Sequence, residues 1–263
     1  MKFTYVIAFF SLLFLLYSCG SKDAARQGEN PKADTIFVED FVAKGEVKIV
    51  EPVIDEQVLV LEKNGIRLTE IKSENIRDAT IALDTKKFKE GKNHLNFTVK
   101  EIQKYSIAYL ANNYSLSQFK ADVFDVEFMY GNNVFLAFLT DEGDISIKTN
   151  KGSVLKNAVL GGVESLFDMD QSHLFYYLPQ AETAAPILDF YLVNTSIAEG
   201  GNKVIVSINE TEFIINKWTA YKIGGLKNGE NTVRIQLLDK NNNLIEGPFN
   251  DSGERKFLLT PNA

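Results

Sequence analysis

The chain of 263 residues contains two histidines and one cysteine, which limits the reactions its side chains could carry out. A zinc site needs several histidine, cysteine or carboxylate ligands that converge on one point. Catalysis by a serine or cysteine nucleophile needs a neighbouring base that a third group orients. His94 lies on the polar side of an alternating segment, and His173 begins an apolar segment. We interpret both as surface or boundary histidines rather than as ligands or bases.

Two acidic segments have a spacing that could supply oxygen ligands to calcium. They are Asp168-Met169-Asp170 and Asp239-x-Asn241-x-Asn243. Neither has the complete loop with its glycine and terminal glutamate, and the second lies where a hairpin turn is expected. The 35 acidic residues include no pair that a pattern singles out for hydrolysis, and no glycine-rich phosphate loop is present. We therefore predict no metal, no cofactor and no enzyme activity; a degenerate hydrolase is the least favoured alternative.

Aromatic side chains are the remaining candidates for binding, because Phe, Tyr and Trp make up 11% of the chain. Tyrosine and tryptophan often carry the binding energy of an interface. Four of them lie near the expected junction between two domains and are our candidate binding residues: Tyr176, Tyr177, Trp218 and Tyr221. The competing interpretation is structural, since a β-sandwich core also consumes aromatic residues in bulk.

The single cysteine, Cys19, follows a segment that predicts a covalent modification. Residues 3–17 are an apolar run, shorter than the ~20 residues that span a membrane comfortably, after a positive charge at Lys2. The run ends in Leu16-Tyr17-Ser18-Cys19, which resembles the bacterial lipobox, and a lone cysteine has no disulfide partner. We predict that residues 1–18 are a lipoprotein signal peptide. Cys19 would then carry palmitate or a similar lipid and attach the chain to a membrane.

Residues 19–43 are small, polar and charged, which predicts a flexible linker behind the lipid anchor. Removal of residues 1–18 leaves 27 basic and 35 acidic residues, a net charge of −8. An acidic surface argues against nucleic acid and against a polybasic membrane patch. We expect an outer-membrane lipoprotein of a cell envelope, with the periplasmic and the surface face both left open.

From residue 44 onward the pattern is that of short β-strands. Residues 95–99 alternate between apolar and polar side chains, as in a half-buried strand. Between residues 188 and 259, further strands are separated by turns rich in Gly, Asn and Asp at spacings of ~8–12 residues. We predict an all-β fold of two immunoglobulin-like β-sandwich domains, residues 44–168 and 169–263. Short helices remain an alternative at 62–79 and 150–168.

Several short motifs occur together in the second predicted domain. They are His173-Leu174-Phe175-Tyr176-Tyr177, Leu188-Asp189-Phe190-Tyr191, Lys217-Trp218, Gly229-Glu230-Asn231-Thr232-Val233 and Gly247-Pro248-Phe249-Asn250. With these motifs, residues 170–260 resemble a family of Bacteroidota envelope proteins usually labelled phosphopeptide-binding proteins. Residues 95–140 resemble it more weakly. The resemblance implies an immunoglobulin-like second domain.

The sequence departs from that family at Ser106 and Ala108, where relatives tend to carry a His-x-His pair. The departure implies that a ligand or metal bound by such a pair is lost here. Phosphopeptide recognition uses clustered arginines, whereas Arg26, Arg67, Arg77, Arg234 and Arg255 are scattered in sequence. We therefore expect a module that binds an envelope protein, a peptide or a glycan. The alternative is a structural accessory subunit of an envelope complex.

Overall fold

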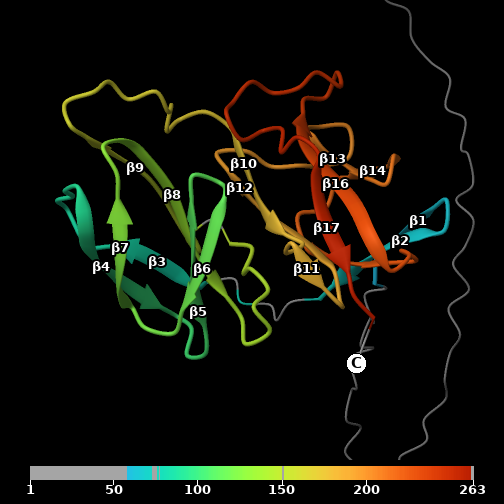
Figure 1. The fold of residues 1–263 in the computed structure, drawn as a ribbon, viewed down its shortest axis with the longest axis horizontal. Coiled ribbons are helices and arrows are strands. Elements are labelled where there is room, and N and C mark those ends of the chain that lie inside the picture. The colour runs from blue at the N-terminus through green and yellow to red at the C-terminus, as the bar shows by residue number, and fades with distance from the viewer. Residues whose placement is uncertain (1–57, 73–75, 77, 150, 262–263) are drawn as a thin grey trace, which may run out of the picture. The chain divides into compact units, whose positions relative to one another are not determined.

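A computed structural model describes residues 58–72, 76, 78–149 and 151–261 of the chain. The predicted signal peptide, the Cys19 anchor and the linker at 19–43 lie outside these residues. The described residues form 17 β-strands and no helix, so the predicted all-β class is confirmed (Figure 1). Within them, no helix long and apolar enough to cross a membrane occurs.

Strands β3 to β9 form a first sandwich of two antiparallel sheets (Figure 1). One sheet has the order β3-β4-β7, and the other has the order β6-β5-β8-β9. Apolar side chains from both sheets, including Leu95, Phe97 and Phe135, pack between them. The strands are β3 (Thr80–Leu83), β4 (Gly91–Lys100), β5 (Ser106–Ala111), β6 (Ser115–Phe119), β7 (Val123–Phe128), β8 (Gly131–Thr140) and β9 (Ser153–Leu160).

Strands β10 to β17 form a second sandwich with the same strand order. The sheet β10-β12-β15 corresponds to β3-β4-β7, and β17-β16-β13-β14 corresponds to β9-β8-β5-β6. The short strand β11 adds to β17 in parallel. The strands are β10 (His173–Leu178), β11 (Glu182–Thr183), β12 (Ile187–Val193), β13 (Lys203–Ile208), β14 (Thr211–Ile215), β15 (Ala220–Gly224), β16 (Gly229–Leu238) and β17 (Arg255–Leu259).

The hairpin β1 (Val60–Lys63) and β2 (Ile66–Ile71) belongs to the second sandwich, because β2 pairs with β15. Ile66 and Leu68 enter the core of that sandwich. The predicted first domain, 44–168, included these residues and needs correction there, since sheet pairing across the chain overrides their position in sequence. The residues considered for short helices, 62–79 and 150–168, contain β2 and β9 instead.

The ten-residue strands β4, β8 and β16 all begin with the same local structure, Gly-x-Asn. In each, the glycine has a positive φ, and the side-chain nitrogen of the asparagine donates to the carbonyls two and four residues earlier, at 2.7–3.2 Å. The asparagines, Asn93, Asn133 and Asn231, are buried. The chain must turn sharply into each strand, and the amide satisfies the turn's backbone carbonyls.

Strands β8 and β16 also end alike, which identifies the two sandwiches as structural repeats. The carboxylates of Asp141 and Asp239 each accept hydrogen bonds from the amides two and four residues later, at 2.8–2.9 Å. Gly131 and Gly229, like Asp141 and Asp239, are 98 residues apart. The segment at Asp239 is thus a hairpin-type turn, in which the Asp239 carboxylate accepts hydrogen bonds from backbone amides of the same turn.

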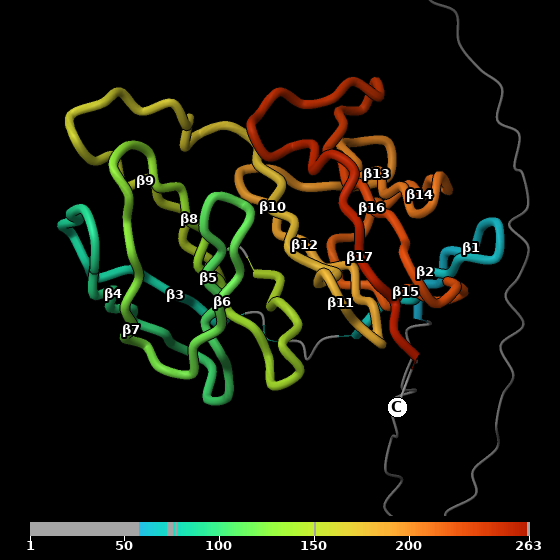
Figure 2. The backbone as a smooth tube through the Cα atoms, viewed as in Figure 1, coloured from blue at the N-terminus to red at the C-terminus, as the bar shows by residue number. Residues whose placement is uncertain are grey.

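A third apolar cluster joins the sandwiches into one compact unit. The side chains of Val134, Leu136 and Phe138 point away from the core of the first sandwich. They pack against Phe175 of β10 and Tyr191 of β12. Strand β8 is therefore buried on both faces, which explains its unbroken apolar run. Figure 2 shows the backbones of β5 and β8 next to those of β10 and β12. The candidate functional site described below lies in this junction.

Candidate functional site

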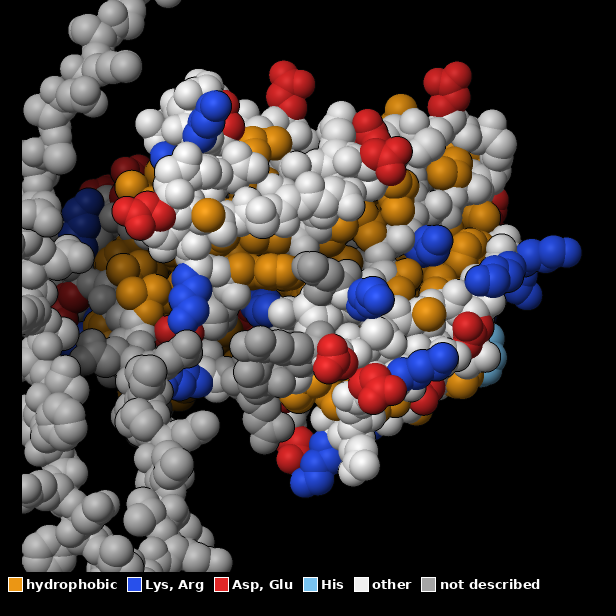
Figure 3. Space-filling view, turned by 180° about the vertical axis from the view of Figure 1, so that it is seen from behind, with side chains coloured by type: hydrophobic (Ala, Val, Ile, Leu, Met, Phe, Trp, Pro, Cys, Tyr) orange, Lys and Arg blue, Asp and Glu red, His pale blue; other side chains and the backbone are white. Residues whose placement is uncertain are grey.

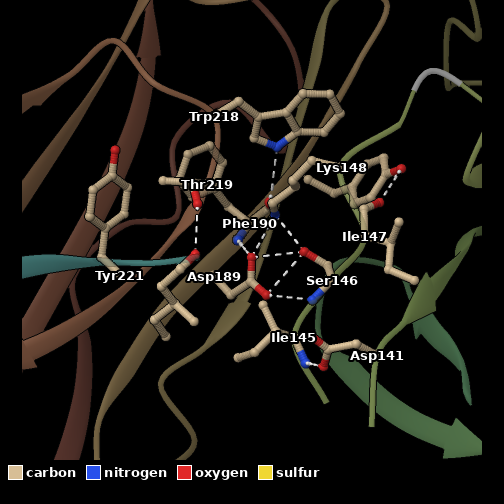
Figure 4. Close-up of polar contacts among 12 residues, drawn as sticks. Asp141, Ile145, Ser146, Ile147, Lys148, Asp189, Phe190, Trp218, Thr219 and Tyr221 are labelled. Atoms are coloured by element: carbon tan, nitrogen blue, oxygen red, sulfur yellow. Dashed lines mark hydrogen bonds and ion pairs between the residues drawn. The ribbon is translucent and has the colours of Figure 1, made fainter. Parts of the chain in front are cut away.

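A buried ionic cluster of Ser146, Lys148 and Asp189 lies at the junction (Figure 4). Ser146 and Lys148 follow β8 in the first sandwich, and Asp189 is in the middle of β12. Strand β12 directs Leu188, Phe190 and Leu192 into the second core, so alternation turns Asp189 and Tyr191 toward the first sandwich. Asp189 and Ser146 are fully buried.

Asp189 is held by hydrogen bonds from both sandwiches. Its carboxylate accepts from the backbone amide of Ser146 at 3.1 Å, the Ser146 hydroxyl at 2.9 Å and its neighbour's amide at 2.9 Å. Lys148 Nζ lies 2.6 Å from Asp189 Oδ1 and 2.5 Å from Ser146 Oγ, and also donates to the Phe190 carbonyl. A buried charge pair of this kind is tolerated only when such additional bonds accompany it.

The cluster has the same residue types as the serine–lysine pair of some hydrolases, but a substrate cannot reach its serine. Burial lowers the pKa of Lys148, while the charge of Asp189 opposes that shift. The Ser146 hydroxyl is fully buried and shared between Asp189 and Lys148, so no substrate carbonyl can approach it. A nucleophile must reach its substrate, and this geometry supports a structural role for the cluster.

Trp218 covers the cluster from the segment before β15 (Figure 4). Its indole nitrogen donates to the Phe190 carbonyl at 3.3 Å, and its ring meets Tyr191 edge to face at 5.0 Å. Lys148 Nζ lies 5.6 Å from the ring centroid, within range of a cation–π interaction. Trp218 is half-buried, so these contacts fix the ring while part of it stays accessible.

The accessible part of Trp218 borders a hollow of about 470 Å³. The remaining lining comes from β9, from β12 and from loops of both sandwiches: Thr149, Ser153, Leu155, Met169, Tyr191, Leu192, Val193, Asn194 and Thr195. The lining thus combines hydroxyl and amide groups with apolar side chains, and among the described residues no charged side chain belongs to it. The side-chain nitrogen of Asn194 donates to the carbonyls of Met169 and Gln171 at 2.8 and 3.0 Å, which fixes this side chain at the rim of the hollow.

Tyr176 and Tyr221 are core residues, which corrects their assignment as binding residues. Tyr176 and Tyr221 are 2% and 0% exposed and belong to the second core, while Tyr177 is 8% exposed and packs in the junction. The Tyr221 hydroxyl donates to the carbonyl of Lys217 at 2.9 Å. The structural interpretation therefore applies to Tyr176 and Tyr221, whereas Tyr177 also lines a separate hollow of about 240 Å³ beside Leu178 and Pro179. Among the four candidates, only Trp218 borders the hollow of about 470 Å³.

The histidines occupy different environments. His94 is exposed and lies 2.8 Å from Asp125 Oδ1. His173 is fully buried rather than at the surface, because Phe167 stacks on its ring at 4.3 Å, and its Nε2 donates to the Asp168 carbonyl at 2.7 Å. Burial lowers the pKa of His173, which keeps the ring neutral. In the described part of the chain, no group of three or more metal-ligating side chains converges.

Each of the described arginines Arg67, Arg234 and Arg255 contacts a different partner. Arg67 pairs with Glu62 at 2.8 Å, and Arg234 pairs with Asp251 at 2.5 Å. Arg255 lies over the Tyr176 ring, 5.0 Å from its centroid. Arg26 and Arg77 lie outside the described residues. The geometry of these three arginines therefore gives no support to a phosphate-binding cluster.

Figure 3 shows apolar side chains reaching the surface in a band across the middle of one face, with charged side chains scattered around it. The exposed large apolar side chains of the described residues lie at strand edges and loop tips: Val58, Val60, Tyr114, Val123, Met129, Tyr130, Leu166, Ile214, Leu244 and Leu258. None of them is among the binding residues predicted from the sequence, because burial cannot be inferred from a residue's type alone.

No protein-family model matches the chain, and the comparison with curated proteins finds no match. Among solved structures, fibronectin(III)-like modules of Clostridium thermocellum CbhA are similar at 8% identity, covering 69% of this chain and 95% of that chain, with a TM-score of 0.25. Bacteroides ovatus SGBP-B of the mixed-linkage glucan utilization locus, solved in complex with a mixed-linkage heptasaccharide, is similar at 9% identity, covering 69% of this chain and 70% of that chain, with a TM-score of 0.22. This likeness carries no argument about function.

Proposed function

We propose that the chain is a lipid-anchored, non-catalytic binding module of a bacterial cell envelope, and that its ligand is a neutral glycan held at Trp218. The observation that carries the proposal is an immobilised, half-buried tryptophan bordering a hollow lined by hydroxyl and amide groups. Sugars present apolar C–H faces and hydroxyl edges, and a hollow of this composition matches both. Binding sites typically combine apolar walls with a few placed polar groups.

Electrostatics favours a neutral ligand over an anionic one. The only ionic pair beneath Trp218 among the described residues, Lys148 with Asp189, is internally neutralised and buried. The predicted mature chain has a net charge of −8, which repels acidic polymers at low ionic strength. The fixed position of Trp218 also favours affinity. Little conformational entropy is lost on binding when the site is already formed.

Affinity electrophoresis tests this proposal with the full chain solubilised in detergent. We expect at least one gel containing mixed-linkage β-glucan, xylan, mannan or pullulan to retard the protein, and gels containing pectin or alginate to leave it unaffected. Trp218→Ala should abolish the retardation. The matched control is Tyr114→Ala, which removes an aromatic that is 87% exposed and lies outside the hollow. Equal migration of all proteins in every neutral gel would count against the proposal.

The membrane anchor is a separate part of the proposal. Cys19→Ala with the signal segment unchanged should move the protein from the membrane fraction to the soluble fraction, because one thiol carries the attachment. Ser18→Ala, which keeps a small residue before the cysteine, is the matched control and should stay with the membrane. Membrane association of the Cys19→Ala protein would refute the anchor.

A further inference from the structure

Tyr130 forms an aromatic platform at the opposite end of β9 from the Trp218 hollow. Its side chain comes from the turn between β7 and β8, and the ring lies directly against Gly161, the residue after β9. A Cβ atom built at Gly161 would lie 2.1 Å from the ring, and the backbone there has φ of 82°. Only glycine therefore permits this contact, and the ring is supported on one face.

The turn that carries Tyr130 is fixed on both sides. Asn133 accepts from the Met129 amide at 2.8 Å and donates to the Met129 carbonyl at 2.8 Å and the Ala158 carbonyl at 3.1 Å. Asn132 donates to the Glu164 carbonyl at 3.1 Å and accepts from the Leu166 amide at 3.1 Å. These bonds hold the turn against the loop after β9, so the ring is positioned before any ligand arrives.

The platform is strongly exposed despite this support. Tyr130 is 64% exposed, and its neighbours Met129 and Leu166 are 74% and 85% exposed. Leaving these three large apolar side chains in water, two on the fixed turn and Leu166 on the loop after β9, has no benefit for the fold, because burial of apolar surface is what stabilises it. A supported aromatic ring with a free face is a surface on which a sugar ring can stack.

Strand β9 connects the platform to the hollow. Ser153 and Leu155 line the hollow, and Gly161 supports Tyr130. Gly161 lies six positions after Leu155 along the chain, which corresponds to about 20 Å at the rise of a β-strand. The loop that follows β9 passes both places, since Leu166 lies beside the platform and Met169 lines the hollow.

We infer that Tyr130 is a second contact for an extended neutral glycan whose first contact is Trp218. This inference rests on the proposed function and specifies the ligand further, as a linear chain long enough to reach from the hollow at Leu155 to Tyr130 beside Gly161, a distance of roughly 20 Å along β9. Two linked contacts raise affinity for a ligand that reaches both and leave a shorter ligand unaffected. The role of Tyr130 is therefore visible only as a dependence on ligand length.

The experiment measures binding of the full chain to size-fractionated oligosaccharides from mixed-linkage β-glucan, xylan, mannan and pullulan, from two sugars to polymer. The native chain should bind long chains more tightly than short ones. Tyr130→Ala should weaken binding of the long chains by about tenfold, which corresponds to ~1.4 kcal/mol, without changing the short ones. Tyr130→Phe keeps the stacking face and should bind as the native chain does. Gly161→Ala displaces the ring and should reproduce the effect of Tyr130→Ala.

Three results separate failure of the inference from failure of the proposed function. If Trp218→Ala abolishes binding while Tyr130→Ala leaves the affinity for glycans of every length unchanged, the inference is wrong and the proposed function stands. Absence of binding to every neutral glycan by the native chain overturns both. If Tyr130→Ala instead releases a co-purifying envelope protein with glycan binding intact, the platform is a protein contact and the inference is again wrong. Thermal unfolding of each variant checks that the fold is retained.

Discussion

At the scale of single residues, the ionic cluster explains why Trp218 can be both rigid and accessible. Lys148 lies beneath the indole, Asp189 holds Lys148, and Ser146 connects Asp189 to the first sandwich. None of the three residues was recognised from sequence. Ser146 and Lys148 lie in an irregular segment after β8, and Asp189 interrupts an apolar strand. A single acid within such a run, Leu-Asp-Phe-Tyr-Leu, is the signal that could have indicated a buried partner.

Removing one member of the pair should be costly. Lys148→Met leaves the Asp189 carboxylate buried without its cation, so we expect a loss of about 3–5 kcal/mol in the free energy of unfolding. The double variant Lys148→Met/Asp189→Leu should recover part of this loss, because no unpaired charge remains. Denaturant titration measures both values. A single variant as stable as the native chain would contradict the buried, paired geometry.

Alkaline titration tests the burial of the tyrosines. Burial raises the pKa of five tyrosines far above its usual value: Tyr109, Tyr176, Tyr177, Tyr191 and Tyr221. Burial and the neighbouring Asp122 raise the pKa of Tyr105 to about 12. These groups favour the folded state fully below the unfolded pKa of about 10, and this stability is lost as pH rises through the folded values.

The buried tyrosines should ionise only together with unfolding, so their absorbance change should coincide with the loss of structure at a pH above about 10. Tyr176→Phe should lower the amplitude of this change. Ionisation of Tyr176 while the chain is still folded would place its hydroxyl at the surface and contradict the structure.

At the scale of elements, sequence periodicity indicated most strands but not their partners. The alternation at residues 95–99 lies in β4, and the strands from residue 188 onward occur as expected. Pairing of β2 with β15 could not be inferred, because nothing local in residues 60–71 specifies a partner about 150 residues away. The unbroken apolar runs of β8 and β10 did indicate that these strands are covered on both faces, because a strand buried on one face alternates between apolar and polar residues.

The Gly-x-Asn sequences that begin β4, β8 and β16 are visible in the sequence. Their structural role could not be inferred without the hydrogen bonds of the buried asparagines. Asn231→Ala would leave the carbonyls of Lys227 and Gly229 without their donor. We expect it to lower the free energy of unfolding by about 1–3 kcal/mol, the cost of unsatisfied buried polar groups. Asn228→Ala, at an exposed position of the same turn, is the control and should be close to neutral. Equal effects of the two substitutions would refute the structural role of the buried amide.

At the scale of the whole described unit, the junction couples the two sandwiches. The apolar cluster around Phe138 and Tyr191 and the Asp189 pair both cross it. We expect calorimetry to show one cooperative transition for the native chain, because neither sandwich can unfold without exposing that cluster. Phe138→Ala should lower stability by about 3–5 kcal/mol and separate the transition into two. Two independent transitions in the native chain would contradict the coupling.

Trp218 is the only tryptophan in the chain, so its fluorescence reports directly on the hollow. The most direct test of the glycan proposal is a fluorescence titration of the full chain with soluble mixed-linkage β-glucan, xylan, mannan and pullulan. We expect a saturable change in intensity and a shift to shorter wavelength with at least one of them, because a bound sugar displaces water from the indole. An emission spectrum unchanged by all four neutral polymers would contradict the proposed site.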